Sequence, residues 1–163
     1  MIERLGLVPH PAEGGYFAET YRSDEAVPAS ALPARYGRDK ALATAIYYLI
    51  TPATFSAMHR LASDEVFHFY AGDAVEMLQL ASDGSHRVIR LGSDVEAGEL
   101  PQAVVPKFVW QGSRLAPGGE WALLGTTVAP AFDYDDYEQG DRGKLIEAYP
   151  ACEGMIRALT RGT

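Results

Sequence analysis

The sequence predicts an all-β domain, a sandwich or barrel of short strands with short helices near its ends. Ten prolines and sixteen glycines divide the 163 residues into short segments, several of them rich in β-branched and aromatic residues. Seven or more such segments with turn signals between them are typical of a β-sandwich or barrel. The length suits one domain, so we expect residues 1–163 to form a single unit without an interdomain linker.

The predicted strands follow one another along most of the chain. Residues 15–22 alternate between two faces, whereas residues 42–50 are apolar nearly throughout, which suits a strand covered on both faces. Asp83-Gly84 before Val88 is the clearest hairpin signal. Further strands are expected over residues 65–70, 75–80, 104–110 and 121–128.

The remaining segments are predicted to be helical or irregular. Residues 142–149 and 151–160 carry apolar side chains at helical spacing, which predicts two helices packed on the barrel. Residues 23–39 contain several prolines and alanines and are expected to form a loop or flap. Cys152 is the single cysteine, so we expect no disulfide within the chain and a packing role for this thiol.

Composition argues against several classes of partner. The formal charge of −8 and the isoelectric point near 4.9 would repel phosphate backbones, so nucleic acid is not an expected partner. No run of eighteen apolar residues is present, and residues 1–8 lack the apolar region of a signal peptide. We therefore expect no membrane partner and a reduced, cytoplasmic location.

Two motifs carry a resemblance to the cupins. His59, Glu65 and Gly72 resemble the first cupin motif, and residues 105–111, Val-Pro-Lys-Phe-Val-Trp-Gln, resemble the second. Three further strings resemble a cupin subfamily known as a domain of unknown function: residues 9–22, 44–49 and 119–130. The resemblance covers about residues 3–160. It implies a double-stranded β-helix, the cupin jelly-roll barrel, with a pocket in the barrel mouth and no settled activity.

The chain departs from the ligand pattern of a metal-binding cupin, which has three histidines and one glutamate. His59 and Glu65 stand at two of those positions, but Leu61 and Gln111 occupy the other two. Leucine cannot ligate a metal, and glutamine offers only a weak oxygen donor. If a divalent metal is bound, we expect His59, Glu65 and Gln111 to hold it. His68 does not complete this set, because its side chain leaves the opposite face of the strand from Glu65.

The leading functional hypothesis is an isomerase or epimerase of a sugar-like or carbonyl-bearing small molecule. His59 is expected to act as the base and Glu65 to orient it, with a tyrosine returning a proton. This arrangement is remotely similar to metal-free sugar epimerases. The expected ligand-binding residues are Tyr47, Tyr48, Trp110, Gln111, Arg22 and His68. Two alternatives are a divalent-metal-dependent oxygenase or hydrolase, and a ligand-binding protein without catalysis.

Structural roles are expected for several other polar residues. His10 and His86 are expected to be structural, and the acidic run 133–138 lacks the spacing of a calcium loop, which predicts a solvated turn. Arg22 is a candidate for an anionic group, although an ion pair is the commoner outcome. The resemblance implies that the segment with Glu13, Tyr16 and Arg22 adds to the sheet of a partner subunit. A homodimer is therefore expected, since an open edge strand needs covering.

Overall fold

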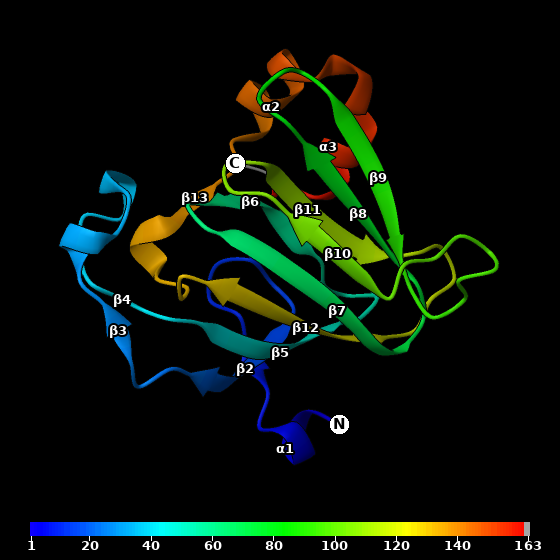
Figure 1. Cartoon of the computed structure of the whole chain (residues 1–163). Helices are drawn as coiled ribbons and strands as arrows, with labels where there is room; N and C mark the ends of the chain where they lie inside the picture. Colours follow the sequence, from blue (N-terminus) through cyan, green and yellow to red (C-terminus); the bar gives the residue numbers. More distant parts are fainter. Residues whose placement is uncertain (162–163) are drawn as a thin grey trace.

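Two antiparallel sheets packed face to face form the body of the molecule in a computed structural model that describes residues 1–161 (Figure 1). The six-stranded sheet has the spatial order β1 (Val8–Pro9), β2 (Tyr16–Arg22), β5 (Thr44–Ile50), β12 (Ala122–Ala129), β7 (Asp64–Gly72) and β10 (Gln102–Val105). The five-stranded sheet has the order β13 (Tyr137–Gln139), β6 (Ser56–Leu61), β11 (Trp110–Leu115), β8 (Val75–Leu80) and β9 (His86–Leu91). The predicted all-β fold with short helices is confirmed.

Smaller elements complete the chain. β3 (Ala26–Val27) and β4 (Lys40–Ala41) form a separate ribbon around the irregular segment 28–39, which contains two 3-10 turns, η1 (Ala29–Ala31) and η2 (Ala34–Tyr36). The helical elements are α1 (Ile2–Leu5), η3 (Tyr134–Asp136), α2 (Arg142–Ala148), η4 (Pro150–Cys152) and α3 (Glu153–Ala158). Within the described residues, no helix has both the length and the apolar character needed to cross a membrane.

The main core lies between the two sheets. Alternate residues of each strand point inward, as the period of two of a β-strand requires. The inward set from the six-stranded sheet includes Tyr48, Ile50, Phe67 and Leu124, and Met77 contributes from β8. All five are at most 2% exposed.

A second apolar cluster attaches the C-terminal helices to the outer face of the five-stranded sheet (Figure 1). Leu78 and Leu80 of β8 point away from the main core and meet Leu145 of α2 and Ile156 of α3. Cys152 is buried in this cluster as a free thiol, which confirms its packing role. Because both faces of β8 are covered, four of its six residues are apolar, and the exceptions are Glu76 and Gln79.

Two strand predictions need correction. The expected strand over residues 104–110 is wrong: β10 ends at Val105, and β11 begins at Trp110. Pro106 has no N–H for a ladder, and Phe108 adopts a positive φ of 64°, so the chain turns between the sheets. β6 was not expected, since His59 and Arg60 interrupt its apolar pattern. The hairpin at Asp83-Gly84 is confirmed by the pairing of β8 with β9.

Candidate functional site

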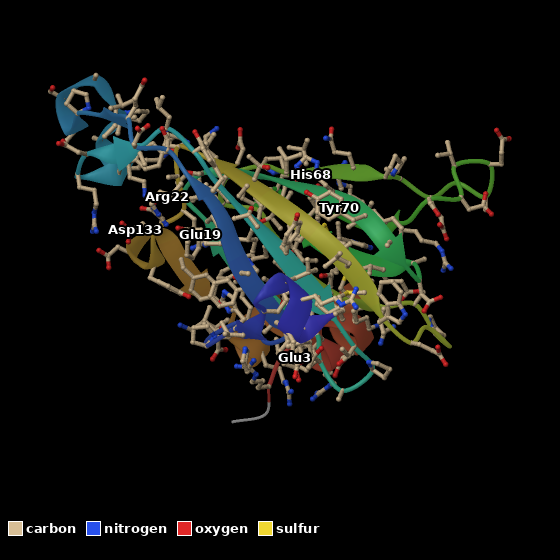
Figure 2. All side chains as sticks on the ribbon, turned by 90° about the horizontal axis from the view of Figure 1, so that it is seen from below. Glu3, Glu19, Arg22, His68, Tyr70 and Asp133 are labelled. Carbon is tan, nitrogen blue, oxygen red and sulfur yellow. The ribbon has the colours of Figure 1, made fainter. Side chains whose placement is uncertain are left out.

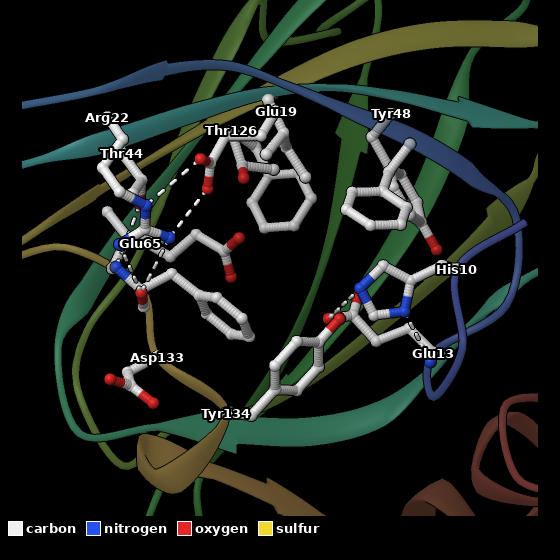
Figure 3. Close-up of a pocket in the computed structure, with 15 residues that line it drawn as sticks. His10, Glu13, Glu19, Arg22, Thr44, Tyr48, Glu65, Thr126, Asp133 and Tyr134 are labelled. Atoms are coloured by element: carbon white, nitrogen blue, oxygen red, sulfur yellow. Dashed lines mark hydrogen bonds and ion pairs between the residues drawn. The ribbon is translucent and has the colours of Figure 1, made fainter. Parts of the chain in front are cut away.

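A cavity of about 370 Å³ opens between the inner face of the six-stranded sheet and two irregular segments (Figure 3). The irregular segments are residues 10–13, before β2, and residues 132–134, after β12. The sheet supplies most of the apolar wall, because its inward-pointing side chains continue the core pattern as far as the opening. The apolar and aromatic lining residues are Phe17, Ile46, Tyr48, Phe67, Val128, Phe132 and Tyr134.

Glu65, His59 and Gln111 meet at the inner end of this cavity. His59 and Gln111 are directly paired across β6 and β11 of the five-stranded sheet, while Glu65 lies on β7 of the facing sheet. The Gln111 amide nitrogen lies 2.8 Å from His59 Nε2 and donates to Glu65 Oε2 at 3.3 Å. The structure thus brings together the three side chains that the motifs singled out. Glu65 lines the cavity, whereas His59 and Gln111 lie behind it, each 1% exposed.

Backbone contacts determine the tautomer of His59. Its Nδ1 lies 2.8 Å from the Ala57 carbonyl oxygen, which can only accept, so Nδ1 carries the proton. Burial lowers the pKa of His59, opposed by the negative charge of Glu65, and the neutral ring therefore has its lone pair on Nε2. The Gln111 amide N–H donates to that lone pair. Gln111 Oε1 is consequently left buried with no hydrogen-bond partner among the described residues.

Glu65 is the carboxyl group most suited to proton exchange near neutral pH. Burial among apolar strands raises its pKa to about 7, against the opposing effects of His59 and of hydrogen bonds from Thr126 and Gln111. Nearby Glu13 adds a smaller upward contribution. A carboxyl group with such a pKa can both accept and donate a proton at physiological pH.

His10 and Glu13 line the cavity from the segment before β2 (Figure 3). His10 Nδ1 accepts from the backbone N–H of Glu13 at 2.9 Å, so the neutral ring carries its proton on Nε2, 3.6 Å from Glu13 Oε1. The same Glu13 oxygen lies 3.6 Å from His59 Nε2. Burial raises the pKa of Glu13 and lowers the pKa of His10. His10 was expected to be structural, and the structure also places it in the cavity wall.

The cavity mouth carries an ion pair. Arg22 donates two hydrogen bonds to Glu19, at 2.7 and 3.1 Å, and further bonds to the Phe132 carbonyl oxygen at 3.4 Å (Figure 3). The ion pair foreseen for Arg22 is therefore present, and the side chain also lines the cavity. β2, which carries Arg22, pairs with β5 of its own chain.

The acidic run after β12 is more than the solvated turn that was expected. Asp133 and Tyr134 line the cavity, and Asp136 forms a buried ion pair with Lys40. The Lys40 and Asp136 side chains are 2% and 8% exposed. This pair attaches the segment to β4, so that its first residues are held over the opening.

Of the other expected ligand-binding residues, only Tyr48 faces the cavity. Its hydroxyl donates to the Gly14 carbonyl oxygen at 2.6 Å, and burial raises its pKa well above the ordinary value. Tyr47 is adjacent to the inward-pointing Tyr48, and His68 is three residues after the inward-pointing Glu65. Because side chains alternate along a strand, Tyr47 and His68 point to the outer face of the six-stranded sheet. Trp110 lies under the Arg60 guanidinium, 4.4 Å from its ring centroid, outside the lining set.

The side chains near Glu65 do not fit the metal centre of a cupin. The His59 lone pair that would ligate is taken by the Gln111 N–H, and Leu61 provides no donor. Among residues 1–161, no three His, Cys, Asp or Glu side chains are grouped so as to hold a metal ion. The residues at this site therefore do not support metal chemistry.

A two-sheet barrel with a cavity that places a few polar groups among apolar walls is the architecture of a cupin. The family model described as Cupin superfamily (DUF985) matches residues 1–140, and the chain belongs to this family. An uncharacterized protein of Saccharomyces cerevisiae is 30% identical over 146 residues, covering 84% of this chain and 72% of the yeast protein.

Solved structures agree with this assignment. A hypothetical protein from Leishmania major has a TM-score of 0.88 and 35% identity, covering 99% of this chain and 97% of the other. A Shewanella oneidensis protein has a TM-score of 0.87 and 33% identity, with coverages of 99% and 96%. Oxalate decarboxylase from Bacillus subtilis shares the fold alone, with a TM-score of 0.56 and 12% identity over 96% of this chain and 41% of that one.

Proposed function

We propose that this cupin is an enzyme that moves a proton on a small carbonyl compound, as an isomerase or epimerase does, with Glu65 as the acid–base group. The observation that carries the proposal is the position of Glu65 in the cavity wall with a pKa near 7. His59, first considered as the base, is 1% exposed and its free nitrogen is engaged by Gln111. His59 therefore acts on Glu65 rather than on substrate.

In this mechanism the ionised Glu65 carboxylate removes the proton from the carbon beside the substrate carbonyl. The electron pair of the broken C–H bond moves onto the carbonyl oxygen and gives an enolate. Tyr134 lines the same cavity and is the hydroxyl that stabilises this oxygen by donating a hydrogen bond. Glu65 then returns a proton to the neighbouring carbon of the enediol, while Tyr134 passes its proton to the former carbonyl oxygen and takes up the proton of the neighbouring hydroxyl group, which completes an isomerisation. An epimerisation instead requires a second acid that protonates the same carbon from the opposite face. The apolar walls exclude water, which strengthens the interactions within the cavity.

The test is deuterium exchange in D₂O with a panel of aldoses, ketoses and amino sugars, followed by proton NMR of the carbon next to the carbonyl. We expect the wild-type protein to exchange a member of the panel and Glu65→Gln to slow exchange by about 10²-fold or more. Glu76→Gln is the matched control, because Glu76 pairs with Arg114 outside the cavity. Exchange that survives in Glu65→Gln would rule out this role.

Two further outcomes identify the alternatives. Exchange that stops when a chelator is added would favour a divalent-metal enzyme. A ligand that binds in the cavity and is recovered without deuterium would favour a binding protein without catalysis.

A further inference from the structure

Carboxyl groups outnumber cationic side chains in the cavity wall. Four carboxyl groups line it, from Glu13, Glu19, Glu65 and Asp133, against one guanidinium, from Arg22. All three guanidinium nitrogens of Arg22 donate to Glu19 or to the Phe132 carbonyl oxygen. The only lining Lys or Arg in the described chain is therefore already neutralised, and it leaves no free cation for an anionic ligand.

Glu13 and Glu65, the two inner carboxyl groups, have no permanent positive partner within residues 1–161. The ionisable groups in contact with Glu13 are His10 and His59, each at 3.6 Å, and Ser56 donates a hydrogen bond to it at 3.4 Å; Glu65 forms no ion pair among these residues. Both histidines are neutral, because burial lowers their pKa values and their tautomers are determined by backbone contacts. Carboxylates in an apolar cavity are stable in the ionised form only when a cation is paired with them.

The walls around these carboxyl groups are aromatic. Phe17, Tyr48, Phe132 and Tyr134 line the cavity together with Phe67. Aromatic ring faces attract cations, and the attraction strengthens where water is excluded. The volume of about 370 Å³ corresponds to about a dozen water molecules at roughly 30 Å³ each, which fits one ring with a short polar arm.

We propose that the cavity binds a small organic cation, a ring compound with an ammonium group that lies against Glu13 and Glu65 while the ring packs on the aromatic walls. The inference rests on the proposed function in that it names the substrate class of the same cavity. Together the two proposals describe an amino-substituted carbonyl compound. The ammonium also favours the ionised form of Glu65, so that substrate binding itself prepares the base.

The experiment measures binding of three probes that share one ring by isothermal titration calorimetry: benzylamine, benzyl alcohol and benzoate. We expect benzylamine to bind more tightly than benzyl alcohol by about tenfold or more, because charge-assisted hydrogen bonds are roughly twice as strong as neutral ones. Benzoate should bind most weakly. At a pH just below 7, benzylamine binding should release protons, seen as a dependence of the heat on the ionisation enthalpy of the buffer.

Variants assign the preference to the carboxyl groups. Glu65→Gln and Glu13→Gln should each reduce the ratio of benzylamine to benzyl alcohol affinity, and Glu76→Gln should leave it unchanged. Circular dichroism checks that each variant is folded. Proton release on benzylamine binding to the wild-type protein tests the involvement of a carboxyl group without a substitution. Benzyl alcohol or benzoate binding as tightly as benzylamine would overturn the proposal. So would failure of all three probes to bind at millimolar concentration, or an unchanged ratio in both cavity variants.

These measurements are independent of catalysis. Tight benzylamine binding without any deuterium exchange would retain the cation site and remove the proton-transfer function. Exchange on neutral sugars without a preference for amines would do the reverse.

Discussion

Glu65 shows how a strand can place a carboxyl group where its proton is easily exchanged. Its cross-strand partners, Val105 and Val128, are apolar and buried, and they remove the water that would stabilise the charge. The nearby His59 and the hydrogen bonds from Thr126 and Gln111 oppose this effect of burial on the pKa without outweighing it. The raised pKa follows from this balance and has a consequence for stability.

The first prediction concerns pH. The pKa of Glu65 is about 7 in the folded protein against an ordinary 4.5, so the folded state holds this proton more tightly than the unfolded state. Folding stability from this group is therefore complete below about pH 4.5 and is lost as pH rises through 7, by about 3 kcal/mol in total. Glu65→Gln does not ionise at this position. The free energy of unfolding of the variant, relative to that of the wild type, should therefore be higher at pH 8 than at pH 5. Urea denaturation at both pH values measures this, and an unchanged difference would contradict it.

At the residue scale, the sequence predicts a side chain well where a motif and a strand face agree. Glu65 met both conditions, whereas His59 and Gln111 were singled out by the motifs alone; the three side chains lie together in the structure. Tyr47 and Tyr48 could not be separated, because adjacent residues face opposite sides and the sequence does not say which side is inside. His10 and Glu13 come from an irregular segment with no periodicity, so only the tertiary fold shows that they reach the cavity.

The contact between β6 and β11 is the element that holds His59 and Gln111 together. The register of the two strands shifts between Gln111 and Ser113. Gly112 lies at the shift, where an added Cβ would be 2.8 Å from Met58 Sδ and 3.0 Å from the Ser56 carbonyl oxygen. The absence of a side chain at this position allows the two strands to approach.

We therefore expect Gly112→Ala to destabilise the protein by about 1–3 kcal/mol, because a methyl group does not fit in this packed region. Gly154→Ala makes the same chemical change in α3, where no atom lies within 4 Å of the added Cβ. It should be neutral or stabilising by up to about 1 kcal/mol. Chemical denaturation of both variants gives the comparison, and equal effects would contradict the close contact at Gly112.

At the element scale, buried strands were predictable and interrupted ones were not. β5 and β8 are apolar over most of their length, since each is covered by other parts of the fold. β6 carries His59 and Arg60 in its interior, so its hydrophobic pattern is broken by the very residue that serves the site. β10 and β11 read as one segment because apolar Phe108 and Val109 fill the turn between them.

On the outer face of the six-stranded sheet, aromatic and aliphatic side chains meet solvent. Tyr70 is 52% exposed, Tyr21 53% and Val104 46%, and Tyr47 lies beside Tyr70 with ring centroids 6.0 Å apart. Figure 2 shows Tyr70 next to His68 on this face, with the rings of the two stacked. Exposed apolar patches of this kind on a sheet are typical of protein interfaces.

We propose that a second copy of the chain covers this face, as expected for a cupin homodimer. Light scattering at micromolar concentration should give twice the 17.7 kDa of one chain. A double variant, Tyr70→Glu with Val104→Glu, should give the mass of a single chain, because two charges would have to be buried in the interface. A monomeric mass for the wild-type protein would refute the dimer.

The two irregular segments at the cavity carry much of its chemistry, although they contribute little to the barrel. Residues 10–13 supply His10 and Glu13, and residues 132–134 supply Phe132, Asp133 and Tyr134. Loops tolerate substitution and insertion better than the strands they connect. During divergence, such a barrel can exchange its ligand by altering two short stretches while Glu65 and the sheet wall stay the same. Related cupins with nearly superimposable backbones are therefore free to act on different molecules.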